Sequence, residues 1–572
     1  MSNQTRRKFL IGASLGLLAL CFGALGLTET KKPVIKKTTK KVTKKPLAKK
    51  IAAAPAKPLA KTALSKPLSS APNPRLGINL GGIDDVSTEL PFVDMFRLNR
   101  GFEMHFATGG PAPEPLDLDE HGWVKNLPKG RYAPTVITTV EGGHFPNGHY
   151  TVLYDGEGEL GFFNAGGDGD IVSKAKGRIV INVDSSRGLW ILTIKATNPA
   201  NYIRNIRVIM PGFENTYQTD PWHPVFMKRW AGVACLRYMD FMHTNNSKQV
   251  RWADRPKVTD ASYAPKGAPL EVTVDLANRQ QAEPWFCMPH LADDDYVRQY
   301  ATYVKANLDP TLKVWVEYSN EVWNSIFEQS IYAGKAGQRL KLAKEEWEAA
   351  NHYAAIRSVQ IFKIWEQVFG GTARLVRVLA SQAATAEVSS RMLSTKVSAT
   401  QIAADYTDAL AIAPYISMLV APTPSADALA EGQVQNWSTD QVFEYLNRKG
   451  LPEATGWIKQ SKKVADKFNV PMVAYEGGQH MLGVLGAENN EKLTKLLFAA
   501  SADPRMGKLY SQYLSVWEQQ GGDLFCAFSS VAGWSKWGTW GAMQYYDEPP
   551  SKAPKFTALL DWAKKRGQKM SY

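Results

Sequence analysis

Two stretches, Trp315-Val-Glu-Tyr-Ser-Asn320-Glu321-Val-Trp323 and Pro471-Met-Val-Ala-Tyr475-Glu476-Gly-Gly478, decide the fold. Each is a short apolar run that ends on a carboxylate, as a buried parallel strand does where it reaches solvent. In a barrel of parallel strands, the C-terminal strand ends share one face, and functional side chains gather there. The two stretches therefore predict that Glu321 and Glu476 reach the same face of one barrel.

An alternation of strand and helix patterns supports this fold from about residue 231 onward. Eight strands are expected, the number that a closed barrel requires, so the predicted fold class is an α/β protein with a (β/α)8 TIM barrel. The expected strands are 75–82, 232–241, 285–289, 313–318, 374–380, 409–413, 471–475 and 524–528. Expected helices include 296–307, 344–369, a segment 439–445 capped by Ser438, and a short helix over 87–96.

The sequence between the first two expected barrel strands has a different pattern of residues. Residues 101–212 contain short alternating runs among Gly- and Asp-rich turns, which indicates a small inserted β-sandwich. The barrel domain is then 75–100 together with 213–572. We expect the sandwich to buttress the barrel, because both of its chain connections enter the barrel; glycan binding is the alternative.

The N-terminal 30 residues are typical of an export signal. Thr5-Arg6-Arg7-Lys8-Phe9-Leu10 resembles the twin-arginine pattern, and an uncharged, mostly apolar run over 9–27 follows it. The protein is expected to be exported, as a periplasmic or secreted protein. The alternative is that an uncleaved signal anchors it to the inner membrane.

A Lys-, Ala- and Pro-rich linker over 31–74 follows the signal and is predicted to be disordered, because it cannot bury enough apolar surface to order itself. The first 74 residues hold 16 of the chain's 68 Lys and Arg residues but only one of its 54 Asp and Glu residues. The remaining chain is therefore almost neutral. This balance argues against a nucleic-acid partner, and the linker is a possible membrane tether.

Cysteine usage gives no sign of a metal or another cofactor. The four cysteines, Cys21, Cys235, Cys287 and Cys526, form no Cys-x-x-Cys motif, and no metal-ligand spacing is present. The last three lie in apolar runs and are expected to be buried free thiols. A disulfide between Cys235 and Cys287 is the alternative.

Two carboxylates from different strands are what glycosidic bond cleavage needs. The segment Glu317-Tyr-Ser-Asn320-Glu321 resembles the Glu-x-x-Asn-Glu motif of clan A of the glycoside hydrolases, which are retaining enzymes with α/β barrels. The resemblance implies that Glu321, ending the fourth strand, is the general acid/base and that Glu476, ending the seventh, is the nucleophile. Val322 stands where many members have proline, so the resemblance indicates the clan but no particular family.

The same resemblance suggests substrate-binding residues. It implies that Asn320 binds the sugar 2-hydroxyl and that Arg237 keeps Glu476 ionised. It places His290 and Tyr415 at strand ends that contact substrate or nucleophile, and Trp534 as a sugar platform.

Other roles compete with these assignments. Arg237 could pair only with Asp240, Glu317 could replace Glu321 as the acid, and His290 and His480 could be structural. Trp537 and Trp540 fit sugar contact and packing equally well.

These observations predict an exported retaining glycoside hydrolase that cleaves a polysaccharide by double displacement. The expected partner is a polysaccharide or oligosaccharide, with β-glucan or a related exopolysaccharide favoured. The alternatives are a non-catalytic carbohydrate-binding protein on a barrel scaffold and a transglycosylase.

Overall fold

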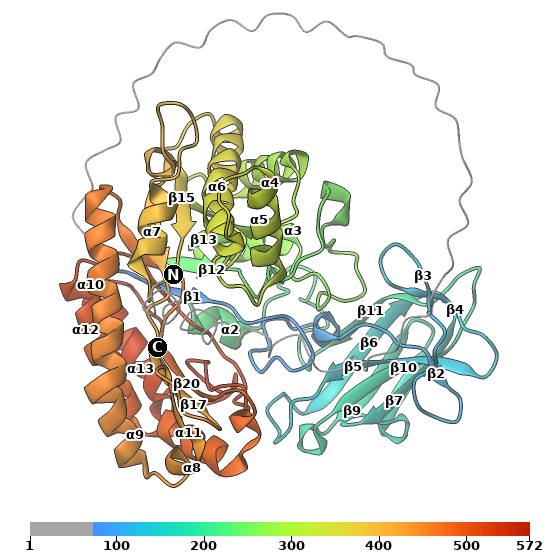
Figure 1. The fold of residues 1–572 in the computed structure, drawn as a ribbon. Coiled ribbons are helices and arrows are strands. Elements are labelled where there is room, and N and C mark those ends of the chain that lie inside the picture. The colour runs from blue at the N-terminus through green and yellow to red at the C-terminus, as the bar shows by residue number, and fades with distance from the viewer. Residues whose placement is uncertain (1–72) are drawn as a thin grey trace, which may run out of the picture.

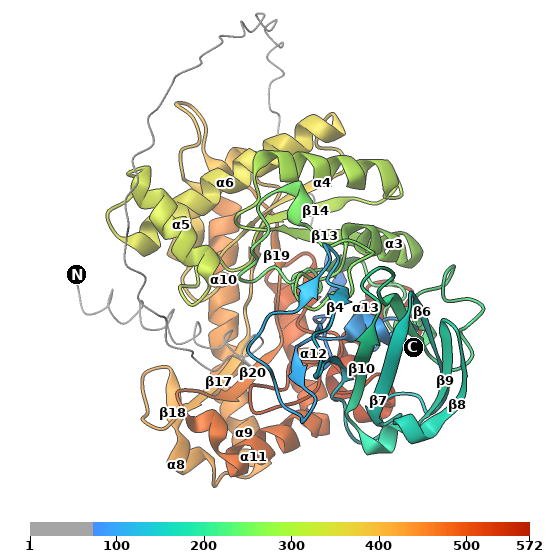
Figure 2. The ribbon, with the colours of Figure 1, turned by 90° about the vertical axis from the view of Figure 1, so that its right-hand side faces the viewer.

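The computed structural model describes residues 73–572, so the predicted export signal and nearly all of the linker lie outside the described residues. Eight parallel strands close into a barrel in chain order, which confirms the predicted fold class (Figures 1 and 2). These strands are β1 (Leu76–Asn79), β12 (Cys235–Arg237), β13 (Glu283–Met288), β14 (Val314–Tyr318), β15 (Leu375–Ala380), β16 (Ala409–Ile412), β19 (Met472–Ala474) and β21 (Phe525–Ala527).

Side chains from alternate strand positions fill the barrel interior. They form a separate apolar cluster that includes Trp285, Trp315 and the three described cysteines. Cys235, Cys287 and Cys526 are buried free thiols, as predicted. Gly77 on β1 is required by close packing, because a Cβ there would lie 2.6 Å from the Sγ of Cys526.

Helices cover the outside of the barrel, and three predicted ones are confirmed as α4 (Asp294–Asn307), α6 (Glu346–Phe369) and α9 (Thr439–Tyr445). At the start of α4, the carboxyl of Asp293 accepts a hydrogen bond from the backbone N–H of Tyr296. The other outer helices are α3 (Leu270–Gln280), α5 (Glu328–Arg339), α7 (Ala386–Leu393), α10 (Leu451–Lys467), α12 (Pro504–Gln519) and α13 (Pro554–Lys565).

The helix predicted over 87–96 is wrong. Leu90 adopts a left-handed backbone (φ 48°), and Phe92 and Asp94 form isolated bridges with Trp222 and Ile209. Only a 3-10 turn, Met95–Leu98, is present. Pairing with these distant segments outweighs the local helical pattern.

Two four-stranded antiparallel sheets lie between β1 and β12 in the chain. They face each other around an apolar core, in which Tyr150 and Trp190 meet edge to face at 5.2 Å. One sheet has the order β2 (His105–Phe106), β5 (Arg131–Thr138), β10 (Trp190–Thr197) and β7 (Gly158–Asn164); the other has the order β11 (Arg204–Ile209), β6 (Gly148–Asp155), β9 (Arg178–Val183) and β8 (Ile171–Ala175).

The sandwich packs against loops at the C-terminal end of the barrel. His144 stacks on Tyr545 at 3.5 Å and lies 2.9 Å from the carboxyl of Asp547, both in the segment after β21. The backbone N–H of Thr139 donates to the carbonyl of Asp85, in the loop after β1. The sandwich therefore stands beside the end of the barrel where functional side chains gather (Figure 2).

A second parallel sheet extends the barrel at this same end. β17 (Ile416–Ala421) follows closely after β16, β20 (Gln479–Gly483) follows closely after β19, and the two strands pair with each other. Two neighbouring barrel strands thus continue outward as a wall, to which β18 (Ala428–Ala430) adds an edge.

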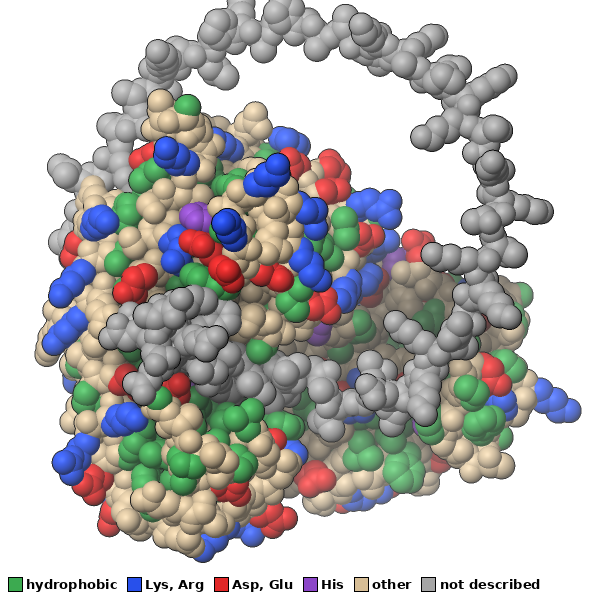
Figure 3. Space-filling model, viewed as in Figure 1, with side chains coloured by type: hydrophobic (Ala, Val, Ile, Leu, Met, Phe, Trp, Pro, Cys, Tyr) green, Lys and Arg blue, Asp and Glu red, His purple; other side chains and the backbone are tan. Residues whose placement is uncertain are grey.

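The surface carries both signs of charge. On the face shown in Figure 3, acidic and basic side chains are intermingled. None of the helices within residues 73–572 is long and apolar enough to cross a membrane.

Candidate active site

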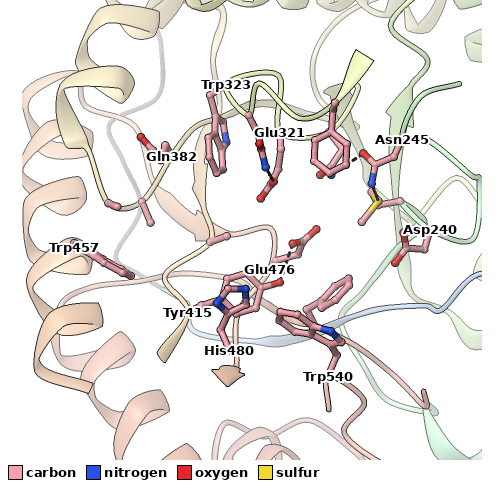
Figure 4. Close-up of a pocket in the computed structure, with 18 residues that line it drawn as sticks. Asp240, Asn245, Glu321, Trp323, Gln382, Tyr415, Trp457, Glu476, His480 and Trp540 are labelled. Carbon is pink, nitrogen blue, oxygen red and sulfur yellow. Dashed lines mark hydrogen bonds between the residues drawn. The ribbon is translucent and has the colours of Figure 1, made fainter. Parts of the chain in front are cut away.

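A cavity lies at the C-terminal end of the barrel strands, and aromatic rings and carboxyl groups line it (Figure 4). The carboxyl groups of Glu321 and Glu476 turn toward the same part of this cavity. Its aromatic lining consists of Trp323, Phe327, Tyr415, Trp457, Phe528 and Trp540. Its other polar lining consists of Asp240, Asn245, Asn320, Asn324, Gln382 and His480.

A tight turn after β14 delivers Glu321 to the cavity. Ser319 (φ 57°) and Glu321 (φ 42°) both adopt the left-handed backbone region, which costs about 1–3 kcal/mol for each such residue. Two hydrogen bonds hold the carboxyl group of Glu321 in place. The hydroxyl of Tyr475 donates to Oε1 of Glu321 at 3.0 Å, and Nδ2 of Asn324 donates to Oε2 at 2.8 Å.

Glu476 lies where β19 ends, immediately before two glycines. A Cβ on Gly477 would lie 2.5 Å from the ring of Phe525, and Gly478 has a φ of 146°, so both positions favour glycine. The Oε1 atom of Glu476 accepts from Nη1 of Arg237 at 2.8 Å, and Oε2 accepts from the hydroxyl of Tyr415 at 2.8 Å.

Arg237, on β12, lies fully buried beneath the cavity and uses all five of its N–H groups. Nε and one Nη2 proton bind Oε2 of Glu317, and the other Nη2 proton binds Oδ1 of Asn320 at 2.8 Å. Nη1 binds Asn79 and Glu476. Arg237 therefore pairs with Glu317 and Glu476 rather than with Asp240, and Glu317 acts as its buried counter-ion.

The two cavity glutamates have different electrostatic surroundings. Burial, reinforced by the charge of Glu476, raises the pKa of Glu321 to about 8, so Glu321 holds a proton at neutral pH. Burial also raises the pKa of Glu476, but the charge of Arg237 and the hydrogen bonds from Tyr415 and Arg237 oppose this rise. The guanidinium contact is made to Glu476 alone of the two, so Glu476 is the one whose ionised form is stabilised directly.

The structure brings most of the predicted site residues together. Asn320, Glu321, Tyr415 and Glu476 line the cavity, and Arg237 supports it from below. The side-chain oxygen of Asn320 accepts a hydrogen bond from Arg237, and its side-chain NH2 group donates one to the side-chain oxygen of Asn245.

Two predicted substrate contacts do not line the cavity. The ring of His290 packs against the ring of Tyr332, with the ring centroids 5.5 Å apart, and is not part of the cavity lining. Trp534 packs against Phe498, with Nζ of Lys555 over its ring. Trp540, further along the same loop, faces the cavity instead.

Several residues of the site were not predicted from the sequence. Tyr475 and Asn324 hold Glu321, yet only their closeness in sequence to the two glutamates hinted at this role. Trp323 is also close to Glu321. Trp457 comes from the outer helix α10 and had no signal in the sequence. Asp240, in the loop after β12, was considered in the sequence only as a partner of Arg237 and not as a cavity residue.

No group of three or more His, Cys, Asp or Glu side chains within residues 73–572 is arranged to hold a metal ion.

Comparison with solved structures finds matches among glycoside hydrolases. A 4-O-α-L-rhamnosyl-β-D-glucuronidase from Fusarium oxysporum 12S matches at 11% identity and a TM-score of 0.35, over 59% of this chain and 63% of that one. An endo-β-1,4-mannanase from Thermotoga petrophila matches at 12% identity and a TM-score of 0.33, over 60% of this chain and 72% of that one.

A family 1 β-glucosidase from Thermotoga maritima also matches, at 12% identity and a TM-score of 0.32, over 61% of this chain and 87% of that one. This chain thus spans less than two thirds of the rhamnosyl-glucuronidase. No protein-family model matches the sequence, and no curated protein is significantly similar to it.

Proposed function

We propose that the protein is a retaining glycoside hydrolase that cleaves a polysaccharide by double displacement. The observation that carries this proposal is the pair of carboxyl groups in one cavity, Glu321 held protonated and Glu476 held against a buried guanidinium. Acid and nucleophile need these opposite protonation states in the free enzyme.

In the first step, the ionised Glu476 attacks the anomeric carbon of the sugar. The glycosidic C–O bond breaks, and Glu321 gives its proton to the departing oxygen. In the second step, Glu321 takes a proton from water, whose oxygen attacks the anomeric carbon and releases Glu476. The product keeps the anomeric configuration of the substrate.

Aromatic rings around the carboxyl pair support a carbohydrate ligand. Trp323, Trp457 and Trp540 line the cavity together with the polar groups of Asn324 and Gln382 (Figure 4). Ligand sites typically combine apolar and aromatic walls with a few placed polar groups. Flat rings of this kind suit the apolar C–H faces of sugars.

The test is hydrolysis of a polysaccharide panel by residues 75–572, followed by NMR of the first products. Release of reducing ends with retained anomeric configuration is expected. Inverted products would contradict double displacement. Binding without cleavage would favour the carbohydrate-binding alternative, and products longer than the substrate would favour transglycosylation.

We also propose that the protein works outside the cytoplasm, on the strength of the Arg6-Arg7 pattern and the apolar run that follows it. Replacement of both arginines by lysine is expected to keep the protein in the cytoplasm on cell fractionation. An unchanged distribution would contradict export by this route.

A further inference from the structure

The cavity is acidic, and its described lining contains no lysine or arginine. Three carboxyl groups face it, those of Asp240, Glu321 and Glu476. The nearest cation, Arg237, lies beneath the cavity with every N–H group already bonded within the protein. His480 also lines the cavity, but burial lowers its pKa to about 3, so its ring is neutral.

Asp240 differs from the other two carboxyl groups because the proposed mechanism does not use it. It follows β12 by three residues, and its carboxyl is turned to the cavity opposite Trp457 (Figure 4). Within the described part of the chain, its carboxyl receives no hydrogen bond and forms no ion pair. A half-buried carboxyl group without a protein partner is left to be satisfied by water or by a ligand.

We propose that the cavity accepts uncharged sugar residues and rejects uronic acids, and that Asp240 sets this preference by accepting hydrogen bonds from sugar hydroxyls. This inference rests on the proposed function, because it assumes that the cavity binds a glycan. Both oxygens of Asp240 are free to accept, and a carboxylate binds a pair of neighbouring hydroxyls well.

The carboxylate of an acidic sugar finds no positively charged partner in this cavity. It would instead meet Asp240 and Glu476, and like charges in a partly desolvated site repel strongly. The same repulsion already acts inside the protein, because burial and the charge of Glu476 raise the pKa of Asp240 to about 7. The rejection of acidic sugars by Asp240 is therefore strongest above about pH 7, where its carboxyl is ionised.

The experiment compares neutral and acidic oligosaccharides of equal length, namely β-linked glucan and mannan hexamers against oligoglucuronate and oligogalacturonate hexamers. Calorimetric binding and release of reducing ends are both measured for the unmodified protein, for Asp240→Asn and for Asp84→Asn. Asp84 is the matched control, because its charge also acts on Asp240 but it does not line the cavity.

The unmodified protein is expected to bind a neutral hexamer at least about 100-fold more tightly than an acidic one. Asp240→Asn should weaken neutral binding about tenfold, as expected when a charged hydrogen-bond acceptor becomes neutral. Acidic binding should stay the same or tighten, because one repelling charge is lost, so the preference for neutral hexamers should narrow by at least about tenfold. Asp84→Asn should retain the preference. A thermal melt checks that each variant is folded. If Asp240→Asn does not fold, Asp240→Ser replaces it in the experiment.

Each other outcome is decisive. Equal binding of neutral and acidic hexamers, or binding of neither, would overturn the inference. Equal effects of Asp240→Asn and Asp84→Asn would overturn the role of Asp240. Cleavage of both classes at equal rates would leave the glycosidase proposal standing and refute the selectivity. Tight binding of neutral hexamers without cleavage would support the selectivity and refute the glycosidase proposal.

Discussion

The barrel mouth and the inserted sandwich place their charged groups in opposite ways. At the mouth, the side chains of Arg237, Glu317 and Glu476 are 0%, 1% and 6% exposed. Arg178 of the sandwich pairs with Glu214, two residues past its C-terminal bound, while both side chains remain about 40% exposed. Exposed pairs contribute little to stability, whereas buried ions incur a large desolvation cost, and such groups cluster at functional sites.

Backbone strain follows the same division. The left-handed non-glycine residues within 101–212 are Asn164 and Asn205, a residue type that tolerates this region. At the mouth they include Ser319 and Glu321, which tolerate it less well. The difference shows that buried charge and backbone strain occur together at the mouth, whereas the sandwich keeps its ion pair partly exposed. The predictions below follow this contrast, ordered by their effect on activity.

Replacement of Glu476, the proposed nucleophile, should have the largest effect. Glu476→Gln is expected to lower kcat about 10⁴-fold, because no other group can form the covalent intermediate. The amide keeps the shape of the side chain, so the thermal unfolding midpoint should change little. Activity within tenfold of the unmodified protein would remove Glu476 from the mechanism.

Arg237→Gln should impair both activity and stability. Loss of the guanidinium leaves the buried Glu317 and Glu476 without their cation, so the free energy of unfolding should fall by about 3–5 kcal/mol. We expect kcat to fall about 10³-fold, the size of effect seen when a key electrostatic contact is removed. Arg178→Gln in the sandwich is the control, with a loss below about 1 kcal/mol in urea unfolding.

Glu321→Gln is expected to lower kcat/KM for a natural glycan about 10²–10⁴-fold, as for the loss of a general acid. A substrate with a good leaving group, such as a dinitrophenyl glycoside, should lose much less in the first step. In the unmodified protein, kcat/KM should fall as the pH rises through about 8, because Glu321 loses its proton there. If Glu321→Gln still loses kcat/KM as the pH rises through about 8, that loss belongs to another titrating group.

Glu321 also links stability to pH. Its pKa is raised from the ordinary value of 4.5 to about 8, so between these pH values the folded state keeps a proton that the unfolded state has released. Its contribution to stability is therefore present below pH 4.5 and is lost as the pH rises to about 8. The difference in unfolding midpoint between the unmodified protein and Glu321→Gln should vary across this window.

Trp190→Phe in the sandwich should have the smallest effect on activity. It removes the hydrogen bond from Nε1 to the buried carbonyl of Gly166, so the free energy of unfolding should fall by about 1–3 kcal/mol. At a temperature where the protein stays folded, kcat is expected to remain within about twofold. A larger loss of kcat would show that the sandwich shapes the mouth.

Much of the architecture was predictable because it depends on local patterns. Short apolar runs mark all eight barrel strands, and alternation with Gly- and Asp-rich turns marks the sandwich. The ends of two runs also placed Glu321 and Glu476 at the same end of the barrel, since parallel strands expose their carboxyl ends together. The prediction for 87–96 failed because this segment pairs with residues far along the chain.

The sequence alone determined the barrel, its insertion and the two strand-end carboxyl groups, because strand period and strand ends are encoded by neighbouring residues. Only the tertiary structure decided which side chains surround the two carboxyl groups. His290 turns away although it follows a strand, whereas Trp457 reaches the cavity from an outer helix. Loop path and helix packing set these directions, and both depend on contacts between residues distant in the chain.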